Sequence, residues 1–276
     1  MNIHEFDPWI GRQKQERDIL ALATVRRMAA ALDRDAGDFA VGGELPVGWH
    51  SVLFSPLAAT RDLDVDGHPR RGDFLPPIPL PRRLFAGRRL KFLRPLRIGD
   101  EIVRTSEITN LRQVEGKSGV LAFVTVRHML NGEDGQMALI EEQDVVYREE
   151  VAKGASRAVP PHDAAEWTAP LSFGALGLFR FSAAVFNAHR IHFDADYARN
   201  VEGYDGLIVN ASFITLHMLR HGELNWADPI AGVDVRNRAL VMADAPIEVI
   251  GGAVEGKRLI QAVQNGRLCV EMRVNP

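Results

Sequence analysis

Four strand-like runs joined by short turns occupy residues 88–148, and they constrain the fold more than any other feature of the sequence. The two later connections, at 115–119 and 131–135, each contain two glycines among polar residues, which favours hairpin turns. Consecutive strands joined by hairpins run antiparallel, so this part of the chain is predicted to form an antiparallel sheet. The predicted strands are residues 89–93, 101–111, 120–130 and 136–147.

The segment before this sheet has a helical pattern followed by loops. Residues 12–34 place apolar side chains at helical spacing, which predicts an amphipathic helix. Residues 35–82 contain Gly-Gly, Asp-Gly and the proline-rich run 75–81. Because proline interrupts helices and cannot donate to a sheet, we expect loops with short extended pieces there.

The second half of the chain repeats this outline. A helix is expected within 172–185 and a long apolar helix at 207–221. Each half is thus a helix followed by antiparallel strands, which predicts an α+β fold made of two divergent copies of one unit. Prolines and glycine mark residues 151–170 as a linker. The strands expected in the second half are residues 237–243, 247–252, 258–263 and 267–274.

Composition limits the classes of partner. The 276 residues have a formal net charge of -3, so no overall positive charge favours nucleic acid or an anionic membrane. The single cysteine, Cys269, lies in a strand-like run and is expected in the core, in a reducing compartment. Neither a signal peptide nor a membrane helix is indicated. We expect a cytoplasmic protein with no nucleic-acid or membrane partner, and a homo-oligomer is compatible with these features.

Residues 187–194 form the densest cluster of proton-transfer groups in the sequence. The polar side chains alternate with bulky apolar ones, so the segment is expected to be half buried. Buried imidazole and amide groups need hydrogen-bond partners, and a substrate can be one of them. The cluster comprises Asn187, His189, Arg190, His192 and Asp194.

Around this cluster the sequence resembles a known family. Residues 181–198 and 202–209 are similar to the hydratase signature of MaoC-like, double hot-dog enoyl-thioester hydratases and dehydratases. Residues 72–83, 94–101 and 141–147 resemble the subgroup that contains mesaconyl-CoA hydratases. The resemblance therefore covers both halves of the chain.

This resemblance implies a fold and a reaction. The fold is a double hot-dog, in which two antiparallel sheets, each wrapped around a long central helix, are joined. Residues 1–150 would form a degenerate unit that binds the substrate and its coenzyme A, and 171–276 the unit with the catalytic motif. The implied reaction is reversible addition of water to the double bond of a 2-enoyl-CoA, such as mesaconyl-CoA. Coenzyme A is part of this small-molecule substrate, so no cofactor is expected.

The resemblance also suggests roles for individual residues. Where the family motif reads Asp-x-Asn-Pro-x-His, this sequence has Asn187 at the aspartate and His192 at the histidine. An amide cannot accept a proton, so His192 is expected to be the base. Asn187 and His189 would orient the histidine or the water. Arg190 stands at the motif proline and is a candidate substrate contact.

The start of the 207–221 helix is expected to stabilise the charge that develops on the thioester oxygen. Free backbone N–H groups and the positive end of the helix dipole can stabilise it there. Relatives have a glycine-containing sequence at this point, whereas this chain has Asn210, Ala211 and Ser212. Candidate contacts for the coenzyme A phosphates are the arginines beside the proline-rich run, Arg82, Arg83 and Arg88.

Two other functions fit some of the same residues. Without the glycine, the protein could bind acyl thioesters and not turn them over. A metal-dependent enzyme could use His189 or His192 together with Asp194. However, Asp194 also matches the first position of a helix, where it would act as a cap. His217 and His221 have metal-ligand spacing but lack a third ligand in the sequence, so no metal site is expected.

Overall fold

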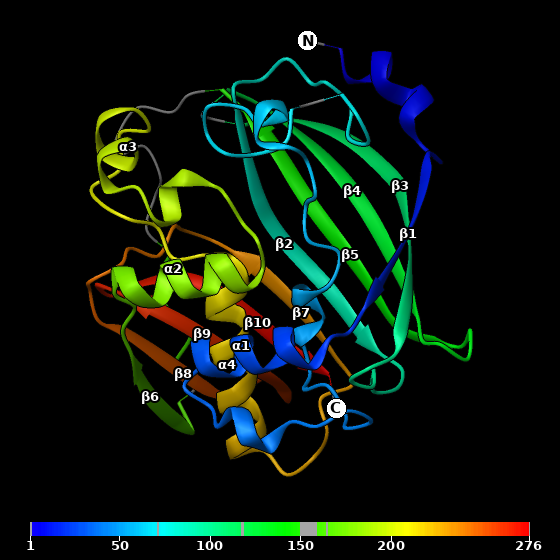
Figure 1. The fold of residues 1–276 in the computed structure, drawn as a ribbon. Coiled ribbons are helices and arrows are strands. Elements are labelled where there is room, and N and C mark those ends of the chain that lie inside the picture. The colour runs from blue at the N-terminus through cyan, green and yellow to red at the C-terminus, as the bar shows by residue number, and fades with distance from the viewer. Residues whose placement is uncertain (1, 71, 117–118, 150–158, 164, 276) are drawn as a thin grey trace.

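Ten strands form one antiparallel sheet in the computed structural model, which describes residues 2–70, 72–116, 119–149, 159–163 and 165–275 (Figure 1). The first five strands are β1 (Gln13–Ile19), β2 (Arg82–Phe92), β3 (Glu101–Gly116), β4 (Gly119–Asn131) and β5 (Met137–Arg148). The second five are β6 (Trp167–Leu171), β7 (Gly232–Asn237), β8 (Ile247–Val254), β9 (Lys257–Gln264) and β10 (Arg267–Asn275).

The two halves of the sheet have the same strand order and meet at equivalent strands. The order is β1-β3-β4-β5-β2-β7-β10-β9-β8-β6, so β2 and β7 pair in the middle. Their register runs from Gly87 opposite Arg236 to Lys91 opposite Gly232. A side chain at Gly87 would place its Cβ 2.3 Å from the carbonyl oxygen of Val235, so only glycine permits this approach. The two expected sheets are therefore one continuous sheet.

The helices are α1 (Leu22–Ala31), α2 (Ala175–Ala184), α3 (Ala195–Asn200) and α4 (Ala211–Asn225). Figure 1 shows α1, α2 and α4 grouped in front of β8, β9 and β10. The Phe181 ring of α2 stacks on Phe213 of α4 with 4.5 Å between ring centroids, and Cys269 is buried nearby in the same core, as expected. The second half contains the 15-residue helix α4. Between α1 and β2 the described residues form 3-10 turns, so the first half departs from the expected pattern.

The hairpin strands lie where the sequence predicts them, but three other elements do not. Residues 13–19, expected in a helix, form the edge strand β1 because they pair with residues 101–107 of β3. Residues 167–170, at the end of the expected linker, belong to β6; residues 150–158 and 164 of that linker lie outside the described ones. Strand β7 begins five residues before the strand predicted at 237–243, because it is residues 232–236 that pair with β2.

Candidate active site

His192 is buried at the end of a short 3-10 turn, Arg190–His192, which follows α2. Its Nδ1–H donates to the backbone carbonyl of Ile208 at 2.8 Å. That bond fixes the tautomer and leaves Nε2 as the nitrogen that can accept a proton. Burial lowers the pKa of His192 to about 4, so the ring is neutral at physiological pH. The structure therefore gives His192 a neutral imidazole whose Nε2 can accept a proton.

The segment that holds His192 leads directly into α4. Asn210 caps this helix, because its side-chain oxygen accepts the N–H of Ser212 at 2.9 Å. Among the described contacts, the N–H of Ala211 at the first helical position has no acceptor. Ala211 has no positive φ, so a glycine is not required by the backbone at this position. The start of α4 thus presents the N–H of Ala211, three residues after Ile208, whose carbonyl binds His192.

Asn187 and His189 shape the turn before His192. The side-chain oxygen of Asn187 accepts the backbone N–H of His189 at 2.9 Å, which is an Asx turn. The ring of His189 meets that of His192 edge-on, with 5.2 Å between centroids. The structure therefore brings His189 next to the expected base, while the Asn187 oxygen is used by the turn itself.

Arg190 and Asp194 bind each other. The guanidinium of Arg190 donates to Asp194 at 2.7 and 3.0 Å and to the carbonyl of Val65 at 3.2 Å. The other carboxylate oxygen of Asp194 accepts the N–H of Tyr197 and caps α3, as its place in the sequence predicts. Asp194 is thus occupied in the cap and in an ion pair, and the cluster of possible metal ligands found among the described residues contains His189 but not Asp194. Arg190 is held by the same contacts and does not lie free for a substrate.

A loop of the first half completes the site, and the sequence did not point to it. Residues 63–69 form a tight turn closed by a bridge between Leu63 and Pro69. The ring of His68 lies against that of His189, with 4.1 Å between centroids. The carbonyl of Asp66 accepts the N–H of Arg190 at 2.9 Å. The run Asp64-Val-Asp-Gly-His68 signals a turn with ionisable groups, but nothing in its spacing relates it to residue 189.

Gly67 sets how closely this loop approaches the motif. Its φ is +91°, and a Cβ here would lie 1.9 Å from the carbonyl oxygen of Ala188. A side chain would therefore be strained by its backbone conformation and would also push the two segments apart. Glycine at this position keeps Asp66 and His68 in contact with the catalytic motif.

The pKa values of Asp66 and His189 in this cluster lie far from their usual values. Burial alone would raise the pKa of Asp66, but hydrogen bonds from the side chain and backbone of His68 hold it well below its usual value. Burial and the nearby His68, His192 and Arg83 charges lower the pKa of His189 far below that of free imidazole. One cluster among the described residues could hold a metal ion. It consists of Asp66, His68 and His189, whose possible ligand atoms lie within 4.8 Å of one another.

The three arginines proposed for coenzyme A have different environments. Arg88 is buried, with an ion pair to Glu141 at 3.3 Å and a hydrogen bond to the Ser212 hydroxyl at 2.6 Å. The expectation that Arg88 meets a phosphate therefore does not hold, because its charge faces the interior. Arg82 pairs with Glu202. Arg83 has no ion pair among the described contacts and lies close enough to influence His189.

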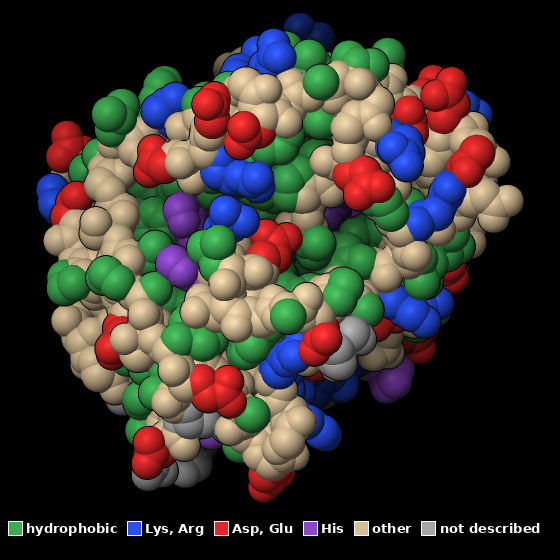
Figure 2. Space-filling view, turned by 90° about the horizontal axis from the view of Figure 1, so that it is seen from below, with side chains coloured by type: hydrophobic (Ala, Val, Ile, Leu, Met, Phe, Trp, Pro, Cys, Tyr) green, Lys and Arg blue, Asp and Glu red, His purple; other side chains and the backbone are tan. Residues whose placement is uncertain are grey.

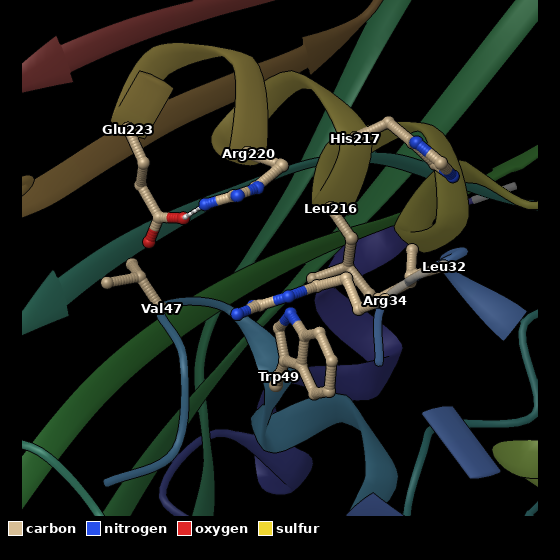
Figure 3. A pocket seen from close by; sticks show the side chains of 8 residues that line it. All are labelled: Leu32, Arg34, Val47, Trp49, Leu216, His217, Arg220 and Glu223. Atoms are coloured by element: carbon tan, nitrogen blue, oxygen red, sulfur yellow. Dashed lines mark ion pairs between the residues drawn. The ribbon is translucent and has the colours of Figure 1, made fainter. Parts of the chain in front are cut away.

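The molecule also has a small cavity beside α4 and one face on which charges of both signs are mixed (Figure 2). A small cavity between α4 and the N-terminal half is lined by Arg34, Trp49, His217 and Glu223 among others (Figure 3), but its volume of about 20 Å³ holds little more than one water molecule. The ring of His217 contacts the rings of Phe173 and Phe213. On the face seen from below, acidic and basic side chains are interspersed (Figure 2).

The sequence and the fold match known proteins. The family model described as hydroxyacyl-thioester dehydratase type 2 matches residues 48–243. The chain is 40% identical over 254 residues to a mesaconyl-C(4)-CoA hydratase of Chloroflexus aurantiacus, covering 91% of this chain and 90% of that relative. A MaoC-like dehydratase from Phytophthora capsici aligns with a TM-score of 0.75 at 13% identity, over 100% of this chain and 98% of the other.

A further match concerns the fold alone. A conserved hypothetical protein of Mycobacterium tuberculosis, described as having a double hotdog fold, aligns with a TM-score of 0.59 at 13% identity. The alignment covers 96% of this chain and 95% of that one. The joined sheet with equivalent halves is consistent with that description. Separately, no helix of the described residues is long and apolar enough to cross a bilayer.

Proposed function

Because this chain belongs to the hydroxyacyl-thioester dehydratase type 2 family, we propose that it hydrates a short branched or dicarboxylic enoyl-CoA such as mesaconyl-CoA. The class of reaction is that of a hydro-lyase on enoyl-CoA thioesters, which the family and the 40% identity to a named hydratase establish. The acyl group is the proposed part. It is supported by the name of that relative, a mesaconyl-C(4)-CoA hydratase.

The observation that carries the proposed site is the bond between His192 and Ile208. It orients Nε2 of a neutral imidazole and ties that imidazole to the segment that begins α4. We propose that Nε2 removes a proton from water while the water oxygen bonds to C3 of the substrate. The electrons of the C2–C3 double bond move toward the thioester, and the charge on its oxygen is stabilised by the Ala211 N–H and the helix dipole. Protonation of C2 completes the addition.

The neighbouring residues are assigned supporting roles. Asn187 holds the turn in place, and Asn210 and Ser212 shape the helix start through the cap. His189, in contact with His192, orients it or the water. Arg83 is the proposed contact for a phosphate of coenzyme A, since its charge is unpaired among the described contacts. Acid–base groups account for each step, so we propose catalysis without a metal or cofactor.

The domain roles and the cellular setting are part of the proposal. We propose that residues 1–150 supply the coenzyme A contacts and that 171–276 supply the base. We also propose a cytoplasmic enzyme, consistent with the single buried Cys269, and a homo-oligomeric state that sedimentation or light scattering can measure.

The decisive experiment is a panel of enoyl-CoA substrates followed by loss of the conjugated thioester absorbance. We expect turnover with mesaconyl-CoA or a close analogue, and a loss of roughly 10² or more in kcat for His192→Ala, which is typical for removal of a general base. His4→Ala is the control, because that side chain is 77% exposed in the N-terminal turn. If the wild type binds coenzyme A esters but turns over none of the panel, it is a thioester-binding protein instead.

A further inference from the structure

The catalytic motif of this chain lacks a carboxylate beside its base. Asn187 stands where the related motif has an aspartate, and Asp194 is used by a helix cap and by Arg190. Addition of water needs one group that removes a proton from water and a source for the proton that reaches C2. A single imidazole can perform both steps in turn, but a second acid–base group removes the need to shuttle the same proton across the double bond.

The loop of residues 63–69 supplies such a group from the other half of the chain. Oδ2 of Asp66 lies 3.0 Å from Nδ1 of His68, which is a hydrogen bond between carboxylate and imidazole. This bond places the proton of a neutral His68 on Nδ1, so that Nε2 accepts a proton, and in the protonated ring the Nε2–H can donate it. Both side chains are about one-third exposed, at 32% and 29%, so the pair is accessible yet shielded.

The position of this pair suits a role opposite His192. The His68 ring contacts His189, and His189 contacts His192, so the two outer imidazoles are separated by one ring. Both imidazoles thus contact the same third ring, which places the two acid–base groups in one cluster. The loop is held in this place by the Asp66–Arg190 backbone bond and by the close packing of Gly67 on Ala188.

We propose that Asp66 and His68 form a second acid–base pair of the active site, in which His68 donates the proton to C2 and Asp66 positions and stabilises His68. This inference rests on the proposed hydratase function. In the hydration direction, His192 takes a proton from water as the C3–O bond forms. The His68 imidazolium then gives a proton to C2 as the electrons of the enolate form the C2–H bond. His192 then releases its proton to solvent and His68 takes one up from solvent, which restores both groups.

A purely structural role for the loop makes different predictions. If His68 only packed against His189, replacing it by another polar side chain of similar size would change stability or KM more than kcat. If instead the cluster were a metal site, chelators would reduce activity and added Zn²⁺ would bind stoichiometrically. The acid–base pair predicts a loss in kcat and a change in the pH profile, neither depending on metal.

The test compares kcat, KM and pH profiles of four proteins on the substrate that the wild type turns over. We expect His68→Gln to lower kcat by roughly 10²- to 10⁴-fold while KM changes little. Asp66→Asn should lower kcat less and alter the pH profile of kcat, because His68 loses the carboxylate that positions it. Asp62→Asn, an exposed carboxylate in the preceding turn, is the matched control and should behave as wild type.

Two results would overturn the inference while leaving the proposed function intact. One is a His68→Gln enzyme with wild-type kcat; the other is a kcat loss that chelation reproduces in the wild type. Thermal unfolding of each variant shows whether the loop change has disturbed the fold. If that occurs, Asp66→Asn, which keeps shape and removes only the charge, carries the test through its pH profile. A wild type without hydratase activity would refute the proposed function itself.

Discussion

At the scale of single residues, burial sets the protonation state of the proposed base. The pKa of His192 is about 4, although its hydrogen bond to Ile208 by itself raises it. A base must be deprotonated to act, so activity should persist as pH falls below 6.5 and decline only near pH 4. We expect the acid limb of kcat/KM, measured in the free enzyme's pH profile, to have its midpoint close to pH 4. If the wild-type profile has its midpoint near pH 6.5 and the His192→Ala profile lacks this midpoint, the His192 imidazole is solvated and this account is wrong.

Also at this scale, the structure changes the meaning of Ala211. The sequence alone suggested that losing a glycine there would restrict the backbone near the substrate. The structure places Ala211 in ordinary helical conformation at the first position of α4, behind the Asn210 cap. The missing glycine is therefore no reason in itself to expect an inactive protein.

At the scale of elements, a buried ionic chain joins the first half to the start of α4. His50 contacts Glu141 of β5 at 3.1 Å, Glu141 pairs with Arg88 of β2, and Arg88 donates to Ser212. Burial alone would raise the pKa of Glu141, but Arg88 and His50 keep it well below its usual value. The carboxylate is thus ionised within the core, and its partners tie strand, turn and helix together.

Removal of one partner should be costly for this reason. We expect Arg88→Met to lower the free energy of unfolding by about 3–5 kcal/mol in urea titrations, because it leaves a buried charge without its main partner. The double variant Arg88→Met/Glu141→Leu should recover much of that loss. Arg89→Met is the matched control on the other face of β2, where a 40% exposed side chain pairs with Glu142 and Asp144. It should cost less than about 1 kcal/mol, and equal effects at both positions would contradict this account.

At the scale of the whole molecule, neutral buried histidines make stability depend on pH. The pKa values of His128, His192 and His217 are each lowered to about 4, in every case chiefly by burial. The unfolded chain, with ordinary values near 6.5, binds more protons between these limits. The free energy of unfolding should therefore be highest above about pH 6.5 and fall as pH drops toward 4, by an amount on the order of several kcal/mol.

Chemical unfolding at a series of pH values measures this slope. His217→Phe should reduce it, because the side chain lies among Phe173 and Phe213 and phenylalanine cannot be protonated. The exposed His4→Gln should leave it unchanged. A slope that is the same in His217→Phe and wild type would show that this histidine is solvated in the folded protein.

The sequence by itself determined the local features of this protein. Alternating runs and glycine turns were enough for the hairpin strands, because short-range pairing depends on neighbouring residues. The density of polar groups at 187–194 marked the candidate site, the resemblance to a family motif singled out His192 as the expected base, and the match of Asp194 to a helix start predicted the cap of α3. The positive φ values of Asn265 and Gly266 are typical of the Asn-Gly hairpin turn that joins β9 and β10.

Tertiary structure alone decided the features that join distant parts of the chain. Residues 13–19 became a strand because the edge of β3 offered them partners, and β2 met β7 because Gly87 allows the backbones to approach. The same kind of contact buried Arg88 and brought His68 to His189. No local pattern encodes such contacts, since their stability comes from groups far apart in the sequence that become neighbours only when the chain has folded.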